Sequence, residues 1–318
     1  MKEMNCKICG NKVDNKIILI KEMFFKLTTE AIPYIVCNKC GTVQIQEIPC
    51  NIDSFYPISQ YYSFVINKKY IKDLIKNYLI KKTFIGRGVI FKILDFYELT
   101  FPAIKSIRKL NLPFNARILD VGCGYGFITR SLKNIGFKNI SGIDPFIDKD
   151  INDSIEIRKI DVHNLEDGEI YDLIMFHHSF EHISDPVETL LKAKKHLSEN
   201  GIILIRMPII GYAFEKYREN WYQLDAPRHL FIYSIYGIEE LLRRVELKIA
   251  DKYYDSNSAQ FKISGNYLRN ISLVEQSKRY YMNFIKSIFS MSFYKFRREA
   301  KILNKNGNGD SIVLYIMK

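Results

Sequence analysis

Short apolar runs separated by polar segments characterise residues 113–255 and return at the end of the chain. Five runs have the length of buried strands: residues 117–121, 139–143, 157–162, 171–176 and 201–207. The segments between them have room for helices, and this alternation predicts an α/β fold built on a sheet. A turn-rich stretch at 304–310 leads into a last apolar run at 311–317, which predicts a terminal strand.

Two further segments have apolar residues at helical spacing. Residues 67–110 predict one or two amphipathic helices, and residues 259–303 predict a helical insertion before the last strand. Both regions are basic: residues 60–110 carry 11 Lys and Arg against 3 Asp and Glu, and residues 256–303 carry 9 against 2. Such charge indicates either solvated helix faces or attraction to an anionic partner, namely a nucleotide-sugar diphosphate, an anionic membrane surface or RNA.

The composition fits one α/β domain joined to a smaller module. Of the 318 residues, 47% are hydrophobic, which is enough for a large core and argues against a disordered chain. We expect an amino-terminal module at 1–60, a helical linker or cap at 61–112, and the main domain at 113–318 with a helical insertion at about 256–307. No apolar run reaches the length of a bilayer span and no signal-peptide pattern opens the chain, so we expect a cytoplasmic protein with reduced thiols.

Cysteine residues define the amino-terminal module. Four of the six form two C-x-x-C-G pairs: Cys6, Cys9, Cys37 and Cys40. Paired knuckles of this kind are typical of a tetrahedral Zn²⁺ site, whereas a redox motif has no need of a second copy. With four thiolates and no open position, the metal is expected to be structural and to stabilise a zinc ribbon that is too small for a large core. Cys50 and Cys123 are interpreted as packing residues.

A glycine-rich turn follows the first strand of the main domain. Asp120 lies near the end of that strand, and Gly122, Gly124 and Gly126 alternate with other residues before a helix begins at Phe127. Glycine lets the backbone turn sharply and approach a ligand without a Cβ atom in the way. The second strand ends in Asp144, and an acid at that position can accept both ribose hydroxyls of a nucleoside.

This D-x-G-x-G-x-G turn resembles motif I of class I S-adenosylmethionine-dependent methyltransferases, and the order of the five strands is similar to that of the family. The resemblance covers roughly residues 113–255 and 310–317. It implies a Rossmann-like seven-stranded sheet and a cofactor, S-adenosylmethionine, held by Asp120, Gly122, Gly124, Gly126 and Asp144. It also implies that Asp161 and Val162 lie beside the adenine and that His177 lines the cofactor pocket. A nicotinamide-binding domain is the competing interpretation, and the glycine spacing disfavours it.

The combination of a cysteine ribbon, a tyrosine-rich tail and this core resembles methyltransferase-23-like enzymes, in particular sugar methyltransferases of polysaccharide and deoxysugar pathways. The tail includes Tyr61 and Tyr62, whose rings suit the C–H face of a sugar or a nucleobase, or simply pack the ribbon onto the core. The resemblance implies O- or C-methylation of a sugar or nucleotide-sugar in surface polysaccharide or glycan biosynthesis.

A second distinctive motif follows the fifth strand. It runs from Trp221, the only tryptophan, to His229 and resembles a segment of the same carbohydrate-pathway enzymes. It lies on the carboxyl-end side of the sheet, where open α/β sheets bind their ligands. Pro227 stiffens the loop and presents Arg228 and His229 in a fixed direction. We therefore expect Trp221 and Arg228 to bind the acceptor, with Arg228 holding a phosphate or a carboxylate.

O-methylation requires a proton to leave the hydroxyl group as its oxygen attacks the sulfonium methyl group. A histidine is a suitable base, and His229 is our first candidate, with Asp225 as its orienting partner. His178 and His182, after the fourth strand, are competing candidates. Alignment of the acceptor with the reactive methyl group can also supply most of the rate without a base.

Two other functions compete with a sugar methyltransferase. The first is methylation of RNA or of another small molecule, suggested by the basic segments and the zinc ribbon. An Asn/Asp-Pro-Pro-aromatic tetrapeptide, common in base-amino methylation, does not follow the fourth strand, so a nucleic-acid substrate is disfavoured. The second is a non-catalytic S-adenosylmethionine-binding module, which would have no need of an intact glycine turn.

Overall fold

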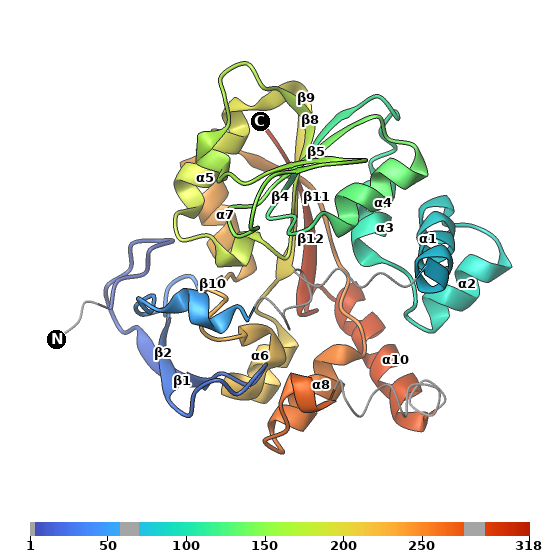
Figure 1. The fold of residues 1–318 in the computed structure, drawn as a ribbon. Helices are drawn as coiled ribbons and strands as arrows, with labels where there is room; N and C mark the ends of the chain where they lie inside the picture. The colour runs from blue at the N-terminus through green and yellow to red at the C-terminus, as the bar shows by residue number, and fades with distance from the viewer. Residues whose placement is uncertain (1–3, 58–69, 277–289) are drawn as a thin grey trace.

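The computed structural model describes residues 4–57, 70–276 and 290–318, with an eight-stranded sheet at its centre (Figure 1). In sheet order the strands are β11 Lys248–Tyr254, β12 Ser311–Met317, β9 Leu197–Pro208, β8 Tyr171–His177, β4 Arg117–Val121, β5 Asn139–Ile143, β7 Glu156–Arg158 and β6 Ile151–Asn152. The five strands from β9 to β7 are parallel, and β12 is antiparallel to both of its neighbours. The predicted α/β sheet is confirmed, with the two-residue strand β6 added at one edge.

Alternating side chains along the strands pack into two separate apolar cores, one on each face of the sheet. In β8, Leu173 and Met175 point to one face, whereas Ile174 and Phe176 point to the other. Each of these four side chains is buried, as expected for a sheet covered on both faces. The strand therefore reads as a continuous apolar run, not as an alternating one.

Helices cover the two faces of the sheet. The first face carries α1 Tyr70–Ile85, α3 Pro102–Lys109 and α4 Phe127–Ile135, which contact one another, with α2 Val89–Phe96 against α1. The second face carries α5 Pro186–Lys195 and α7 Ile235–Arg244. The described part of the basic segment, residues 70–110, thus contains three helices, where one or two were expected. None of the helices in the described residues is both long and apolar enough to cross a membrane.

The amino-terminal module forms a second, antiparallel sheet. It consists of β1 Lys16–Lys21, β2 Ala31–Val36 and β3 Val43–Ile45, and its fourth strand is β10 Phe231–Ile232 from far along the chain. A 3-10 turn, η1 Ile52–Phe55, follows this module in sequence. The buried residues of the module and those of the second sheet face form one continuous apolar cluster. The boundaries expected at residues 60 and 112 stay predictions.

The remaining elements surround the loop that leads to β10. After β9 come α6 Tyr212–Tyr217, η5 Arg218–Asn220 and η6 Tyr222–Leu224, and between β11 and β12 lie α8 Ala259–Tyr267 and α10 Met291–Lys305. These two helices belong to the insertion expected at about 256–307. Two shorter 3-10 turns follow strands of the main sheet: η3 Val162–Asn164 and η4 Phe180–His182.

Candidate active site

The glycine turn connects the end of β4 to the start of α4. Gly122, Gly124 and Gly126 have φ angles of 71°, 54° and 76°, in the left-handed region that favours glycine. The turn is pinned to the neighbouring strand because Gly122 N donates to Ile143 O at 2.9 Å. A Cβ atom on Gly122 would lie 2.5 Å from Ser179 Cβ, so this position also accommodates close approach of the loop after β8.

Asp144 follows β5 and faces the same turn. Its Oδ2 accepts a hydrogen bond from Gly124 N at 2.7 Å, and its Oδ1 accepts from Phe146 N at 2.9 Å. Burial raises the pKa of this carboxyl, against the two amide hydrogen bonds. The carboxylate therefore lies at the carboxyl ends of the adjacent strands β4 and β5, where the sequence analysis predicted an acid that binds a ribose diol.

Asp120 is buried beneath the turn. Its Oδ2 accepts a hydrogen bond from Thr129 Oγ1 at 2.9 Å, which ties β4 to α4. Burial and the neighbouring Asp144 raise the pKa of Asp120 to about 7, and the bond from Thr129 opposes that rise. Asp120 is thus a group whose charge can change near neutral pH.

The other three residues expected at the cofactor lie at the same edge of the sheet. Asp161 is exposed and caps η3 by accepting a hydrogen bond from His163 N at 2.9 Å, whereas Val162 is buried. This cap ends β7 at Arg158, earlier than the predicted strand end at 162. His177 ends β8, and neither of its ring nitrogens has a hydrogen-bond partner among the described residues. Burial lowers the pKa of His177 to about 3, so its ring is neutral.

A cavity of ≈ 290 Å³ opens beside the loop after β8. Most of the residues that line it are polar, and they come from well-separated parts of the chain: Phe24, His178, His182, Arg206, Tyr222, Gln223, Asp225, His229, Asp255, Ser256, Asn257, Leu273, Asp310 and Ser311. Three of the four predicted catalytic residues are the histidines of this wall, and the fourth is Asp225. The structure therefore brings together all four residues from two separate loops.

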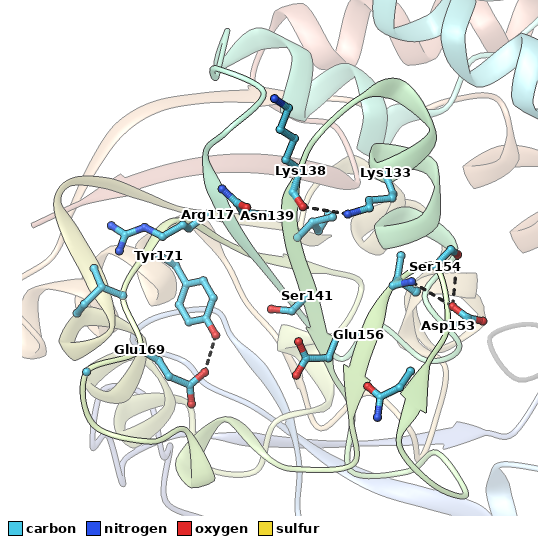
Figure 2. Close-up of a pocket in the computed structure, with 15 residues that line it drawn as sticks. Arg117, Lys133, Lys138, Asn139, Ser141, Asp153, Ser154, Glu156, Glu169 and Tyr171 are labelled. Carbon is cyan, nitrogen blue, oxygen red and sulfur yellow. Dashed lines mark hydrogen bonds between the residues drawn. The ribbon is translucent and has the colours of Figure 1, made fainter.

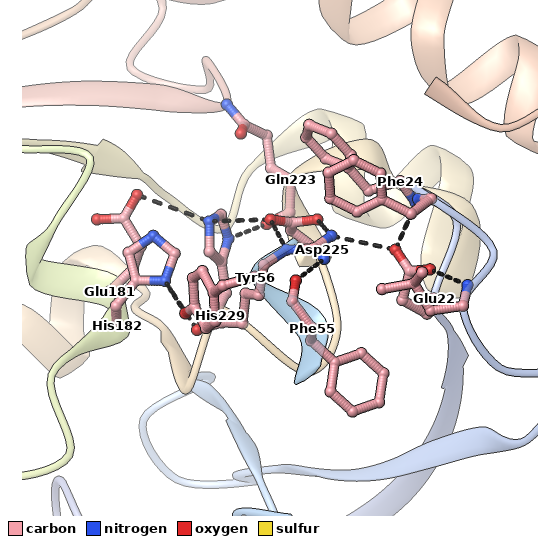
Figure 3. Close-up of polar contacts among 12 residues, drawn as sticks. Glu22, Phe24, Phe55, Tyr56, Glu181, His182, Gln223, Asp225 and His229 are labelled. Atoms are coloured by element: carbon pink, nitrogen blue, oxygen red, sulfur yellow. Dashed lines mark hydrogen bonds and ion pairs between the residues drawn. The ribbon is translucent and has the colours of Figure 1, made fainter. Parts of the chain in front are cut away.

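His229 is held in one orientation within this cavity (Figure 3). Its Nδ1 lies 2.7 Å from Gln223 O, so Nδ1 carries the proton and donates to that carbonyl. Its Nε2 lies 3.8 Å from Asp225 Oδ2 and 3.9 Å from Glu181 Oε1, too far for a hydrogen bond. The orienting partner is therefore the Gln223 carbonyl, where the sequence had suggested Asp225.

Arg228 has different partners from those expected. The side chain is 0% exposed, and its Nη2 donates to Glu22 Oε1 at 3.1 Å and to Asp225 Oδ1. Its Nε donates to Asp225 Oδ2 at 3.0 Å and its Nη1 to Phe55 O at 2.9 Å, while the guanidinium packs over Phe24 at 4.8 Å. An acceptor would have to displace one of these groups to reach Arg228. Arg228 instead joins the loop before β10, which also carries His229, to the amino-terminal module.

The aromatic residues expected at the acceptor divide into two groups. Trp221 is 1% exposed, and its Nε1 donates to Asp310 Oδ2 at 3.2 Å, so its ring packs inside the fold behind the cavity wall. Tyr61 and Tyr62 lie outside the described residues. The nearby Tyr56 does reach the histidines, because its hydroxyl lies 3.2 Å from His182 Nδ1.

His178 and His182 flank a buried carboxylate on the loop after β8. His178 Nδ1 lies 3.2 Å from Glu181 Oε1, and His182 packs edge-on against His229 with 4.7 Å between ring centroids. Burial opposes ionisation of Glu181, yet the hydrogen bond from His178 and the nearby histidine charges outweigh it and lower the pKa of Glu181 to about 2. Burial and the neighbouring His229 lower the pKa of His182 to about 4.

Many residues that line or support this cavity were not among the predicted site residues, and four of them contact the predicted ones directly: Glu22, Tyr56, Glu181 and Gln223. Glu181 precedes His182 in the loop after β8, and that pair is a detectable signal. Gln223 acts through its main-chain carbonyl, which any residue would supply. Glu22 is paired with a residue more than 200 positions away, so local sequence patterns do not indicate its role.

The four paired cysteines converge at one point of the amino-terminal module. Their sulfur atoms all lie within 4.8 Å of one another, with Cys6 Sγ 3.6 Å from Cys40 Sγ and Cys9 Sγ 3.5 Å from Cys37 Sγ. Tetrahedral Zn²⁺ with Zn–S bonds of about 2.3 Å separates its sulfurs by about 3.8 Å, which this cluster matches. Gly10 and Gly41, at φ 72° and 73°, allow the tight turn behind each knuckle.

A larger hollow of ≈ 690 Å³ lies away from this chemistry (Figure 2). It is lined by the starts of β4, β5 and β8, including Arg117, Asn139 and Tyr171. Ligands of open α/β sheets bind at the carboxyl ends of the strands, which is the opposite edge. Its size therefore does not identify it as the cofactor site.

Comparison with known proteins agrees with this geometry. Residues 95–252 match a family model described as a methyltransferase domain. A ubiquinone biosynthesis O-methyltransferase of Rickettsia typhi is 30% identical over 112 residues, which cover 31% of this chain and 45% of that protein. Its counterpart in Rickettsia akari is 25% identical over 182 residues, covering 50% of this chain and 72% of that protein.

A tRNA U34 carboxymethyltransferase of Campylobacter hominis is also similar, with 29% identity over 117 residues that cover 32% of this chain and 41% of that protein. The chain thus spans less than half the length of two of these three relatives. In each case the similarity covers at most half of this chain. The strand order, the glycine turn and the family match together show that the chain carries a class I S-adenosylmethionine-dependent methyltransferase domain.

Proposed function

We propose that this protein transfers the methyl group of S-adenosylmethionine to a small polar acceptor bound in the histidine-lined cavity. The observation that carries the proposal is the contact between the glycine turn and the loop after β8. Ser179 Oγ donates to Val121 O at 2.7 Å beside Gly122, while His178, its direct neighbour, lines the cavity. A cofactor held at the turn would therefore lie next to an acceptor held in the cavity.

The cofactor would be held by the residues at the carboxyl ends of β4, β5 and β7. In the proposed arrangement Asp144 accepts the ribose hydroxyls, and Asp161 and Val162 flank the adenine. The turn from Asp120 to Gly126 approaches the rest of the cofactor without side chains in the way. The neutral ring of His177, whose two nitrogens have no hydrogen-bond partner among the described residues, would supply a further polar contact.

The acceptor is proposed to be a sugar or nucleotide-sugar. The cavity supports this choice because carboxylate, amide and hydroxyl groups make up much of its wall, for example Gln223, Asp255, Asn257 and Asp310. Such groups can accept or donate hydrogen bonds to several hydroxyls of one small ligand. Arg228 and Trp221 are proposed to shape this wall from behind, and Tyr61 and Tyr62 keep the acceptor role suggested by the sequence.

His229 is proposed to receive the proton of an acceptor hydroxyl. Because Nδ1 donates to Gln223 O, Nε2 is the ring nitrogen that could accept this proton, and His229 lines the cavity. The oxygen would form its bond to the methyl carbon as the carbon–sulfur bond breaks, the proton would pass to Nε2, and S-adenosylhomocysteine would leave. We expect His229→Ala to lower turnover by ~10²–10⁴ with cofactor affinity retained.

The cysteine cluster is proposed to hold one structural Zn²⁺. Four buried or half-buried thiolates at tetrahedral spacing leave no position for water or substrate. The ion would fix the ends of the ribbon against β10.

Mass spectrometry tests the acceptor proposal directly. The protein would be incubated with S-adenosylmethionine and a panel of nucleotide-sugars, and a mass gain of one methylene group in a nucleotide-sugar is expected. Asp144→Asn and His229→Ala proteins serve as controls for cofactor and acceptor chemistry. If no nucleotide-sugar or free sugar is methylated while a catechol or phenol is, the acceptor class is wrong and the methyl-transfer assignment stands.

Transfer to RNA is the second candidate, favoured by the tRNA-modifying relative and by the basic charge of residues 60–110 and 256–303. Phosphate contacts weaken steeply with salt. A gel shift with tRNA that disappears between 50 and 200 mM salt, together with label transfer from the cofactor to the RNA, would establish it. Binding without label transfer would not.

A further inference from the structure

Three possible metal-ligating side chains converge where the loop after β8 meets the loop before β10. The ligand atoms of Glu181, His182 and His229 all lie within 4.8 Å of one another. Glu181 is fully buried, and its Oε2 has no hydrogen-bond partner among the described residues. An unpartnered buried carboxylate oxygen is costly unless a ligand or ion satisfies it.

Both histidines are oriented through their other ring nitrogen. His182 Nδ1 lies 2.8 Å from Arg228 O, and His229 Nδ1 lies 2.7 Å from Gln223 O. Because a carbonyl only accepts hydrogen bonds, each Nδ1 carries a proton, and Nε2 is the nitrogen of each ring that could bind a metal ion. A histidine whose Nδ1–H is bound to a main-chain carbonyl is the common arrangement of a metal ligand.

In the described part of the chain, the groups that face Nε2 of His229 are carboxylates. His229 Nε2 is 3.9 Å from Glu181 Oε1 and 3.8 Å from Asp225 Oδ2, so the nearest groups are themselves acceptors (Figure 3). Asp225 is already neutralised by Arg228, which donates to both of its oxygens. Arg228 is therefore engaged with Asp225 and Glu22, and the gap between Glu181 and the two imidazoles is suited to a small cation.

We infer that Glu181, His182 and His229 form a binding site for a divalent transition-metal ion. Two imidazoles and one carboxylate suit Mn²⁺, Fe²⁺ or Zn²⁺, and three protein ligands leave coordination positions open. Because His182 and His229 also line the cavity, we expect an open position to face the acceptor.

The inference rests on the proposed function for the role of the ion, but not for its existence. A hydroxyl of the acceptor bound to the ion would have a lower pKa. The proton of that hydroxyl would pass to solvent. In this arrangement Nε2 of His229 would bind the ion and would not receive the proton itself. The set is distinct from the cysteine cluster, which offers only thiolates.

Titration with Mn²⁺ tests the site, because the hard Mn²⁺ ion competes poorly for thiolates. Electron paramagnetic resonance of free Mn²⁺ would be followed as the ion is added to the full-length protein with its cysteine site loaded with Zn²⁺. We expect one bound Mn²⁺ per chain in the wild type and at least tenfold weaker binding in Glu181→Gln and His229→Gln. Glu246→Gln, which changes an exposed carboxylate that follows α7 and pairs with Lys194, is the matched control and is expected to bind normally.

Thermal melting guards against variants that simply fail to fold. Added Mn²⁺ is expected to raise the Tm of the wild type and of Glu246→Gln, and to leave that of Glu181→Gln unchanged. Absence of any Mn²⁺ or Zn²⁺ bound beyond the one ion at the cysteines would overturn the inference. If wild-type protein without a second metal ion still methylates a nucleotide-sugar, the metal site is wrong and the proposed function stands. If Mn²⁺ binds at this site and no acceptor is methylated, the metal site stands and the proposed function is wrong.

Discussion

Arg228 Nη2 lies 3.1 Å from Glu22 Oε1, and both side chains are fully buried although they are 206 positions apart in the chain. Glu22 also accepts hydrogen bonds from the main-chain N–H groups of Phe24, Phe25 and Leu27. The pair therefore connects the loop after β1 to the loop that carries His229. Removing Arg228 would leave Glu22 and Asp225 without their counter-charge, whereas removing Glu22 would leave Arg228 paired with Asp225.

We expect Arg228→Met to destabilise the protein by about 3–5 kcal/mol, because Glu22 and Asp225 would lose their counter-charge. Urea unfolding followed by circular dichroism measures the change. The double variant Arg228→Met with Glu22→Gln should recover part of the loss. If the Arg228→Met protein is as stable as the wild type and only its KM for the acceptor rises, the result would support the acceptor-binding role that the sequence suggested for Arg228.

Substitution at Gly122 tests the placement of the cofactor turn. Gly122→Ala puts a Cβ atom 2.5 Å from Ser179 Cβ at a φ of 71°, so the turn has to shift. We expect affinity for S-adenosylmethionine to fall at least tenfold, about 1.4 kcal/mol, by isothermal titration calorimetry. Gly168→Ala is a matched control, since its φ is 93° and no atom lies within 4 Å of the added Cβ. Equal affinity in both variants would move the cofactor elsewhere.

Asp144→Asn probes the proposed diol contact. The asparagine keeps the size of the side chain but loses the charge, and its amide nitrogen would face Gly124 N or the ribose. We expect binding of S-adenosylmethionine to weaken by about 1.5–3 kcal/mol, the typical value of hydrogen bonds to a charged group. Unchanged affinity, with the fold intact by circular dichroism, would contradict this role of Asp144.

Asp120 gives the cofactor site a pH dependence. With a pKa of about 7 in the folded protein, raised by burial and Asp144, the folded state binds more protons than the unfolded chain between about pH 4 and 7. Stability of the cofactor-free protein should therefore fall as the pH rises through that window and level off above it. Thermal melts from pH 5 to 8.5 measure this slope, and Asp120→Asn should flatten it.

The same group should couple to the charge of the cofactor. S-adenosylmethionine carries a positive sulfonium, which favours ionised Asp120, so we expect its affinity to rise with pH through about 7. Calorimetry in buffers of different ionisation enthalpy would detect the proton released on binding. A pH-independent affinity would show that Asp120 does not sense the cofactor.

Loss of the proposed zinc ion is expected to impair the acceptor side more than the cofactor side. Tyr34 of β2 donates its hydroxyl to His229 O at 2.8 Å, and Ser234 Oγ donates to Cys40 O. Cys40→Ser should lower the zinc content and reduce turnover, with at most a small change in cofactor affinity. Cys50→Ser serves as the control, because Cys50 is exposed and is not the packing residue that the sequence suggested. Full activity in zinc-free protein would contradict this coupling.

The sequence was sufficient for the sheet and the glycine turn because both depend on local features. Apolar runs such as 171–176 identify a strand buried on two faces, and glycine spacing identifies a turn with positive φ angles. The cysteine pairs were equally readable, since the spacing within each knuckle fixes its shape.

The contacts made by the loop that carries Arg228 and His229 could not be predicted from local sequence features. A charged residue on a loop indicates exposure by default, and only the fold reveals that Arg228 meets Glu22 in the interior. The approach of His182 to His229 likewise depends on two loops that meet only in the folded protein. His229 is oriented by the main-chain carbonyl of Gln223, which a residue of any type would supply, so the sequence does not reveal this contact.

The pairing of β10 with β3 has a consequence for the order in which the molecule can be assembled. During synthesis the chain emerges from its amino terminus, so β3 appears almost 190 residues before its partner at Phe231–Ile232. Until then one edge of the small sheet has no strand beside it, and open edges invite pairing with other chains. Early capture of a metal by the four cysteines would hold that nascent sheet in shape while the ribosome completes the rest.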